Sequence, residues 1–297
     1  MEGGTSHSIW IWLTPSLLTL FLYGIGQGLI KKWIAEVPPA RFCLYFVVAK
    51  TIVNLGFFWT QEHPPLLAPE GHSFMVAGIV AYLMDGAGWI LYFLSIVHGP
   101  ITIVGTLSAA YPALTVLFAR IFLGELLSAW QYLGVGLVIG GCLGLSYAPP
   151  EPGSQPSSKR WIAFAAAALV LWGAAQTIVK YAYELPQASE ANLSIFNTIG
   201  GVLTLGVYGW LRGRLGTHSM GEWGRSFLPM GMMAAGDLGV IIAARTGPIS
   251  LVSPLTGAYP VVTLAFAALV LHEKITKLQG LCIAMILAGM VLSPGSA

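Results

Sequence analysis

Hydrophobic residues along this chain gather into long runs, and polar residues are largely confined to the stretches between them. A helix needs about 20 apolar residues to cross the hydrocarbon core of a bilayer. Runs of about that length occur at residues 9–30, 42–60, 73–97, 101–123, 128–147, 161–183, 192–211, 226–245, 249–271 and 277–294. The pattern therefore predicts an all-α polytopic membrane protein with ten transmembrane helices.

The composition agrees with this prediction and removes several classes of function. Hydrophobic residues make up 56% of the chain and charged residues only 9%, whereas soluble domains carry about 25% charged residues. The net charge of +2 comes without a basic cluster, so we expect the lipid bilayer and no nucleic acid as a partner. Each cysteine (Cys43, Cys142 and Cys282) stands alone in an apolar run, which favours packed thiols over a metal site.

One stretch of the chain occurs twice. Residues 99–131 and 247–279 align without a gap, and 14 of the 33 positions are identical. The matches include a Gly-Pro start, a central Tyr-Pro pair (Tyr111 and Tyr259), a glutamate (Glu125 and Glu273) and a final glutamine. A repeat of about half the chain length in an apolar sequence indicates a duplicated membrane protein.

The duplication extends to the beginning of each half. Gly24, Gln27 and Lys31 in the first run correspond to Gly173, Gln176 and Lys180 in the sixth, and both sets share one helical face. A linker rich in proline, serine and glycine lies between residues 148 and 160, so we divide the chain into five-helix units at 1–148 and 149–297. Because five is odd, the second unit enters the membrane upside down, which predicts two inverted repeats.

The early Tyr/Trp-Gly…Gln…Lys pattern and the late Gly-Pro…Tyr-Pro…Glu…Gln pattern, each present twice, resemble the EamA family of the drug/metabolite transporter superfamily. The resemblance covers essentially the whole chain. It implies ten helices around a central cavity lined mainly by helices 1, 3, 4, 6, 8 and 9. It also implies transport of small polar or amphipathic metabolites, often outward, by a multi-pass protein of the cell (inner) membrane.

Polar and aromatic residues inside the runs are the candidates for this cavity. A charge at the centre of a membrane helix costs about 2.5–3.5 kcal/mol on insertion scales, so such residues usually face the bundle interior or water. Prolines that follow a tyrosine in mid-helix free a backbone carbonyl in the same region. The candidate substrate-binding residues are Gln27, Lys31, Asp85, Trp89, Tyr111, Gln176, Lys180, Asp237 and Tyr259.

The roles of the two aspartates remain open at this point. Asp85 and Asp237 project from the same face of helices three and eight, at depths that differ by about 6 Å. Each is either held by a buried partner, such as Lys50 or Arg245, or exchanges a proton or meets a cationic substrate group. Glu125 and Glu273 precede capping boxes of the form S/T-x-x-Q, which favours a structural role at the start of a helix.

The leading hypothesis is a secondary transporter that works by alternating access as a monomer or homodimer. The favoured direction of transport is export. Protons are a candidate coupling ion. The alternatives are a flippase for a lipid-linked headgroup on the same fold and a membrane scaffold that transports nothing. No nucleophile elbow, phosphate-binding loop or metal-ligand spacing occurs in the sequence, so we expect neither an enzyme nor a cofactor.

The distribution of Lys and Arg predicts the orientation in the membrane. Loops after helices 1, 5, 7 and 9 carry ten of these residues and the other side about three, so the positive-inside rule places both termini outside the cytoplasm. Relatives in the resembling family more usually keep both termini inside. We follow the charge count, so a reporter enzyme that works only in the cytoplasm should be inactive when fused to the C-terminus. An active fusion contradicts the charge count.

Overall fold

The computed structural model describes residues 3–33, 37–98, 110–146, 160–213, 220–272 and 275–292, and helices dominate these ranges. In the first half of the chain the helices are α1 (Gly3–Trp33), α2 (Pro39–Thr60), η1 (Pro69–Gly71), α3 (His72–His98), α5 (Tyr111–Phe118), η2 (Ala119–Leu123) and α6 (Ala129–Ser146). In the second half they are α7 (Arg160–Ala182), α8 (Glu190–Gly201), η3 (Val202–Gly206), α9 (Val207–Gly213), α10 (Met220–Thr246), α11 (Ile249–Gly257), α12 (Pro260–Val270) and α13 (Lys277–Leu292).

Length and apolar composition make seven of the described helical segments candidate membrane spans. They cover residues 9–30, 39–60, 69–95, 160–182, 190–213, 220–246 and 249–270. Three shorter apolar helices, at 111–123, 129–145 and 277–292, coincide with the remaining expected runs. The all-helical fold is thus confirmed for the described residues, whereas the count of ten spans and the inverted repeat stay predictions.

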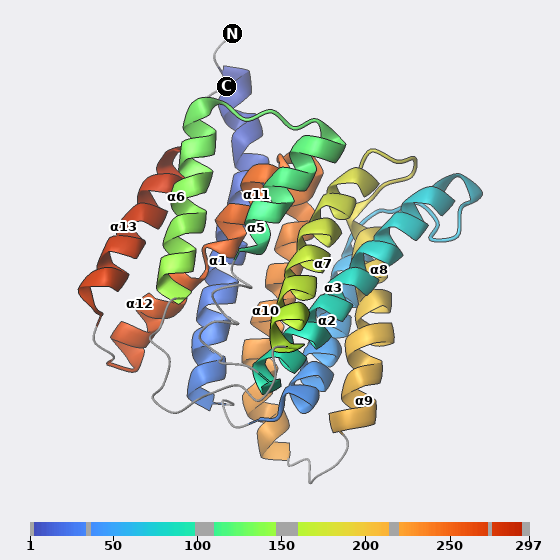
Figure 1. Cartoon of the computed structure of the whole chain (residues 1–297). Coiled ribbons are helices and arrows are strands. Elements are labelled where there is room, and N and C mark those ends of the chain that lie inside the picture. Colours follow the sequence, from blue (N-terminus) through green and yellow to red (C-terminus); the bar gives the residue numbers. More distant parts are fainter. Residues whose placement is uncertain are drawn as a thin grey trace.

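Equivalent helices of the two halves each pack against the opposite half of the chain. α1 packs against α10 of the second half, and α7, which corresponds to α1 in the repeat, packs against α3 of the first half. α2 contacts α8, and α6 lies beside α13 at one edge of the bundle (Figure 1). α1 begins and α13 ends at the same end of the bundle, the upper end in Figure 1. The interior is therefore built jointly by both halves.

Small residues allow the closest of these contacts. A Cβ atom added to Gly289 of α13 would lie 2.4 Å from the carbonyl oxygen of Gly134 in α6, so the two backbones touch at this point. Membrane helices commonly use glycine in this way, because lipid gives no hydrophobic drive for helices to associate. The outer surface is covered with large exposed hydrophobic residues, among them Phe21, Ile52, Leu203, Phe227 and Val291.

The second Tyr-Pro pair breaks its helix. α11 ends at Gly257 and α12 starts at Pro260, with the capping residue Tyr259 between them. The Tyr259 amide donates a long hydrogen bond of 3.4 Å to the carbonyl of Thr256, to which Pro260 cannot donate because proline has no N–H. In the first half, α5 begins at Tyr111, and residues 99–109 lie outside the described ranges. The break follows a segment that is wholly buried, since every residue of α11 is buried.

Candidate functional site

A buried lysine forms the centre of the site. Lys50 lies at the middle of α2, its side chain is 2% exposed, and its Nζ is 2.8 Å from Asp237 Oδ2 on α10. Asp85 Oδ2, from the middle of α3, is 4.0 Å from the same nitrogen. The ammonium group also lies 4.7 Å from the centroid of the Phe46 ring, a cation–π distance. Three helices from both halves of the chain thus meet at one charge cluster.

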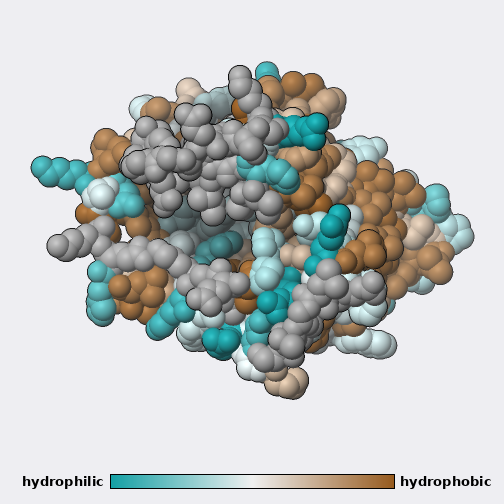
Figure 2. Space-filling view, turned by 60° about the horizontal axis from the view of Figure 1, so that its bottom comes forward, coloured by the Kyte–Doolittle hydropathy of each residue, from teal (hydrophilic) through white to brown (hydrophobic). Residues whose placement is uncertain are grey.

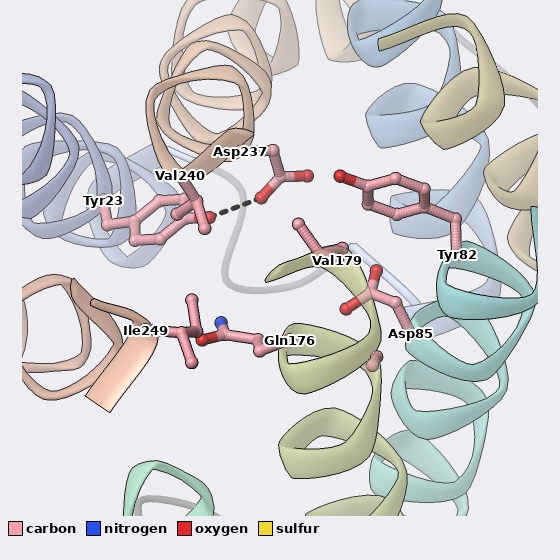
Figure 3. Close-up of a pocket in the computed structure, with 9 residues that line it drawn as sticks. Tyr23, Tyr82, Asp85, Gln176, Val179, Asp237, Val240 and Ile249 are labelled. Carbon is pink, nitrogen blue, oxygen red and sulfur yellow. Dashed lines mark hydrogen bonds between the residues drawn. The ribbon is translucent and has the colours of Figure 1, made fainter. Parts of the chain in front are cut away.

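The two aspartates face a small cavity of about 60 Å³, enough for a few water molecules. Figure 3 shows their carboxylates on opposite sides of it, with the Tyr82 hydroxyl directed toward Asp237. The Tyr23 hydroxyl donates a 2.5 Å hydrogen bond to Asp237 Oδ1. The lining consists of Tyr23, Tyr82, Asp85, Ala175, Gln176, Val179, Asp237, Val240 and Ile249. Lys50 is absent from this set, although its ammonium group lies within 4.0 Å of both carboxylates.

Equivalent aromatic residues from α1 and α7 approach the two aspartates. Tyr23 and Trp172 occupy the same position in the repeat, each one residue before the shared glycine. Tyr23 lies against Gly236, next to Asp237, and Trp172 lies against Gly88, near Asp85. The Trp172 indole N–H donates to the Asp85 backbone carbonyl at 3.2 Å. Each half therefore supports the aspartate of the other half with an aromatic side chain.

Gln176 brings an unsatisfied polar atom to the cavity wall. Its Oε1 is buried and has no hydrogen-bond partner among the described residues, while its side chain interacts with the Tyr111 hydroxyl. A buried amide oxygen without a donor costs about 1–3 kcal/mol, so such an atom in a cavity wall is well placed to accept a hydrogen bond from a ligand or water.

The predicted aromatic residues form a layer beside the cavity. The Trp89 ring packs edge-on against Trp172 with centroids 5.1 Å apart. Tyr111 contacts Trp172 at 5.9 Å, and Tyr259 contacts Tyr23 at 5.8 Å. Trp89, Tyr111 and Tyr259 therefore hold the aromatic residues that support the two aspartates, and none of the three is part of the cavity lining.

A second polar cluster, which we name the hairpin clamp, consists of Glu125 and Lys180 around the α10–α11 turn. The Glu125 carboxylate accepts hydrogen bonds from the backbone N–H of Ile249 and of Ser250, both 2.9 Å, and from the Ser250 hydroxyl at 2.6 Å. Lys180 Nζ donates to the carbonyls of Ala244 at 3.0 Å and Gly247 at 2.8 Å. The clamp lies directly beside the cavity, because Ile249 also lines it.

Glu125 therefore caps a helix other than the expected one. The predicted capping boxes are present: Ser128 and Gln131 exchange side-chain-to-backbone bonds at the start of α6, as do Thr276 and Gln279 before α13. Glu125 instead reaches the N-terminus of α11 in the other half of the chain. Gly124, with a left-handed φ of 68°, turns the chain sharply between η2 and Glu125.

The other sequence-predicted residues have different positions. Lys180 points to the hairpin carbonyls and not into the cavity. Gln27 lies one turn beyond Tyr23 on α1 and is partly buried, outside the cavity lining. The side chain of Lys31 and all of Glu273 lie outside the described residues. Sequence reasoning did not select Tyr23 and Tyr82, although the Tyr/Trp-Gly repeat marks Tyr23. No group of three potential metal-ligating side chains occurs in the described ranges.

Comparison with known proteins agrees with this architecture. The sequence profile of the EamA-like transporter family matches residues 9–147 and again residues 159–293. The chain belongs to the EamA-like transporter family. It is therefore a multi-pass membrane protein and a transporter of the drug/metabolite type.

A solved structure entitled "Crystal structure of protein" is similar in fold, with a TM-score of 0.75 at 18% sequence identity. The match covers 97% of this EamA-like chain and 96% of that one. Comparison with curated proteins finds no significant match.

The charge cluster predicts a non-additive effect on stability. Lys50→Met leaves two partly buried carboxylates without their cation and should lower the free energy of unfolding by about 3 kcal/mol. Lys50→Met combined with Asp237→Asn returns the cluster to its original formal charge and should recover most of that loss. Thermal unfolding in detergent measures both, with Lys277→Met as an exposed control. Equal destabilisation by the single and double variants contradicts the pairing.

Proposed function

We propose that this protein is a secondary transporter that exports a small polar or amphipathic metabolite across the cell (inner) membrane by alternating access. One observation carries the proposal: a cavity at the level of mid-helix charges is lined by two aspartates and by Gln176, whose buried amide oxygen is unsatisfied. Intramembrane ionisable groups that face a cavity usually belong to a substrate or ion pathway.

The arrangement of the halves supports alternating access between units 1–148 and 149–297. α1 packs on α10, and α7 packs on α3. These two contacts are equivalent in the repeat, and both cross the interface between the halves where the cavity lies. Transporters built from inverted repeats place their substrate site at such an interface and rock one unit against the other. The expected inverted topology and ten spans are part of this proposal.

The hairpin clamp supplies a closure at one end of the cavity. Lys180 lies one turn beyond Gln176 on α7, and the clamp joins α7, the segment before α6 and the α10–α11 turn at the upper end of Figure 1. Figure 2 turns the opposite end of the molecule toward the viewer. Its surface is hollowed near the centre, with hydrophilic residues in the hollow. The hydrogen bonds of the clamp favour a state closed at this end, which must open there to complete a transport cycle.

Transport by reconstituted protein tests the proposal directly. Liposomes are loaded in turn with amino acids, sugars, nucleosides and quaternary amines, and efflux of each is compared with that from protein-free liposomes. For a transported compound, Gln176→Leu should lower the rate about tenfold, because an accepting group in the cavity wall is lost. Gln61→Leu, an exposed loop change, should leave the rate unchanged. Equal rates with and without protein for all four compound classes contradict the proposal and favour the scaffold or the flippase alternative.

The clamp generates a separate prediction. Glu125→Ala removes the acceptor for the first amides of α11, and each charge-assisted bond contributes about 1.5–3 kcal/mol. Amide hydrogen exchange across residues 247–252, measured by mass spectrometry, should therefore become faster by a factor of about ten to a hundred. Glu62→Ala, an exposed carboxylate after α2, is the control. Unchanged exchange in Glu125→Ala means that other contacts hold the turn.

A further inference from the structure

The two aspartates in the cavity have different surroundings. Asp237 is engaged on both oxygens, since Oδ2 is 2.8 Å from Lys50 Nζ and Oδ1 accepts a 2.5 Å hydrogen bond from Tyr23. Asp85 lies 4.0 Å from Lys50, at the outer limit of an ion pair, and no hydrogen bond to its carboxylate occurs among the described residues. Its side chain is 28% exposed, against 20% for Asp237. Asp85 is the carboxylate available to a ligand.

The charges around Asp85 do not balance. Lys50 on α2 supplies one positive charge for two carboxylates, which leaves the cluster with a formal charge of −1. Lys180, on α7, is directed to the hairpin carbonyls. The titratable and polar groups that face Asp85 from the surrounding helices are Lys50, Asp237, Tyr23, Tyr82, Tyr111 and Gln176. All except Lys50 and Asp237 are neutral, so one further positive charge would bring the formal charge of the cluster to zero.

The cavity favours an organic ammonium group as that charge. The rings of Tyr23 and Tyr82 form part of its wall, and tyrosine faces together with a carboxylate are a recurring binding site for substituted ammonium. A divalent metal prefers several hard oxygen ligands, and the described residues contain no cluster of that kind. A volume of about 60 Å³ fits a headgroup rather than a whole metabolite.

We propose that Asp85 binds the ammonium headgroup of a small organic cation, and that a proton takes this place on the carboxylate when the cation leaves. The inference rests on the proposed transport function and names its substrate class. One monovalent cation then replaces one proton, so the exchange moves no net charge. Asp237 remains paired with Lys50 throughout and acts as a positioning residue, which keeps the ammonium group of Lys50 away from Asp85.

Binding to purified protein in detergent tests the inference without transport. Choline is titrated by calorimetry in two buffers of different ionisation enthalpy, and the difference between the heats gives the number of protons released. We expect about one proton per choline bound at an acidic pH at which the carboxylate of free Asp85 is protonated, and fewer as the pH rises and this carboxylate ionises. The neutral isostere 3,3-dimethylbutan-1-ol should bind at least about tenfold more weakly and release none. Equal binding of both compounds, or choline binding without proton release at every pH at which the protein is folded, overturns the proposal.

Variants separate the two aspartates. Asp85→Asn should weaken choline binding at least about tenfold and abolish proton release, whereas the exposed control Glu62→Gln should change neither. If Asp85→Asn does not fold, the two-buffer titration of the unaltered protein still decides the question. Choline binding with proton release but no efflux from liposomes contradicts the transport function alone. Efflux of neutral compounds that choline does not inhibit contradicts the cation site alone.

Discussion

The cost of holding an ammonium group in the middle of a membrane constrains the rest of this structure. A central charge costs about 2.5–3.5 kcal/mol on insertion scales, and Lys50 is almost completely buried at the centre of α2. The cost is offset because α10 brings Asp237 to 2.8 Å and α3 brings Asp85 to 4.0 Å. These three helices must keep a common depth, and α1 and α7 pack around them through Tyr23 and Trp172.

The polar contacts near the cavity connect the two halves of the chain. Tyr23 of the first half donates to Asp237 of the second, Trp172 of the second donates to the backbone of Asp85 in the first, and Glu125 of the first caps α11 in the second. A duplicated chain can evolve such reciprocal contacts because each half presents the same helix face to its copy. In the proposed alternating-access cycle, movement of one half against the other would rearrange these contacts together.

Much of this architecture could be predicted from the sequence, because apolar run length and the Gly-Pro and Tyr-Pro repeat are local signals. Asp85, Asp237 and Gln176 could be selected for the cavity because a polar group inside an apolar run has few other places to go. Lys180 and Glu125 could not be assigned, since their partners are backbone groups that lie 64 to 67 and 124 to 125 residues away in the chain. The closer pairing of Lys50 with Asp237, at 2.8 Å against 4.0 Å for Asp85, depends on the exact placement of the helices, which residue types do not encode.

The α10–α11 turn also links movement to hydration. The first amides of a helix have no partner within it, and those of Ile249 and Ser250 are satisfied by the Glu125 carboxylate. If this side chain withdraws, each amide must bond to water or lose about 1–3 kcal/mol. Water therefore has to arrive as the contacts break, and wetting becomes part of the opening step in the proposed cycle. Solutes that draw water out of narrow spaces should hold this end of the protein shut.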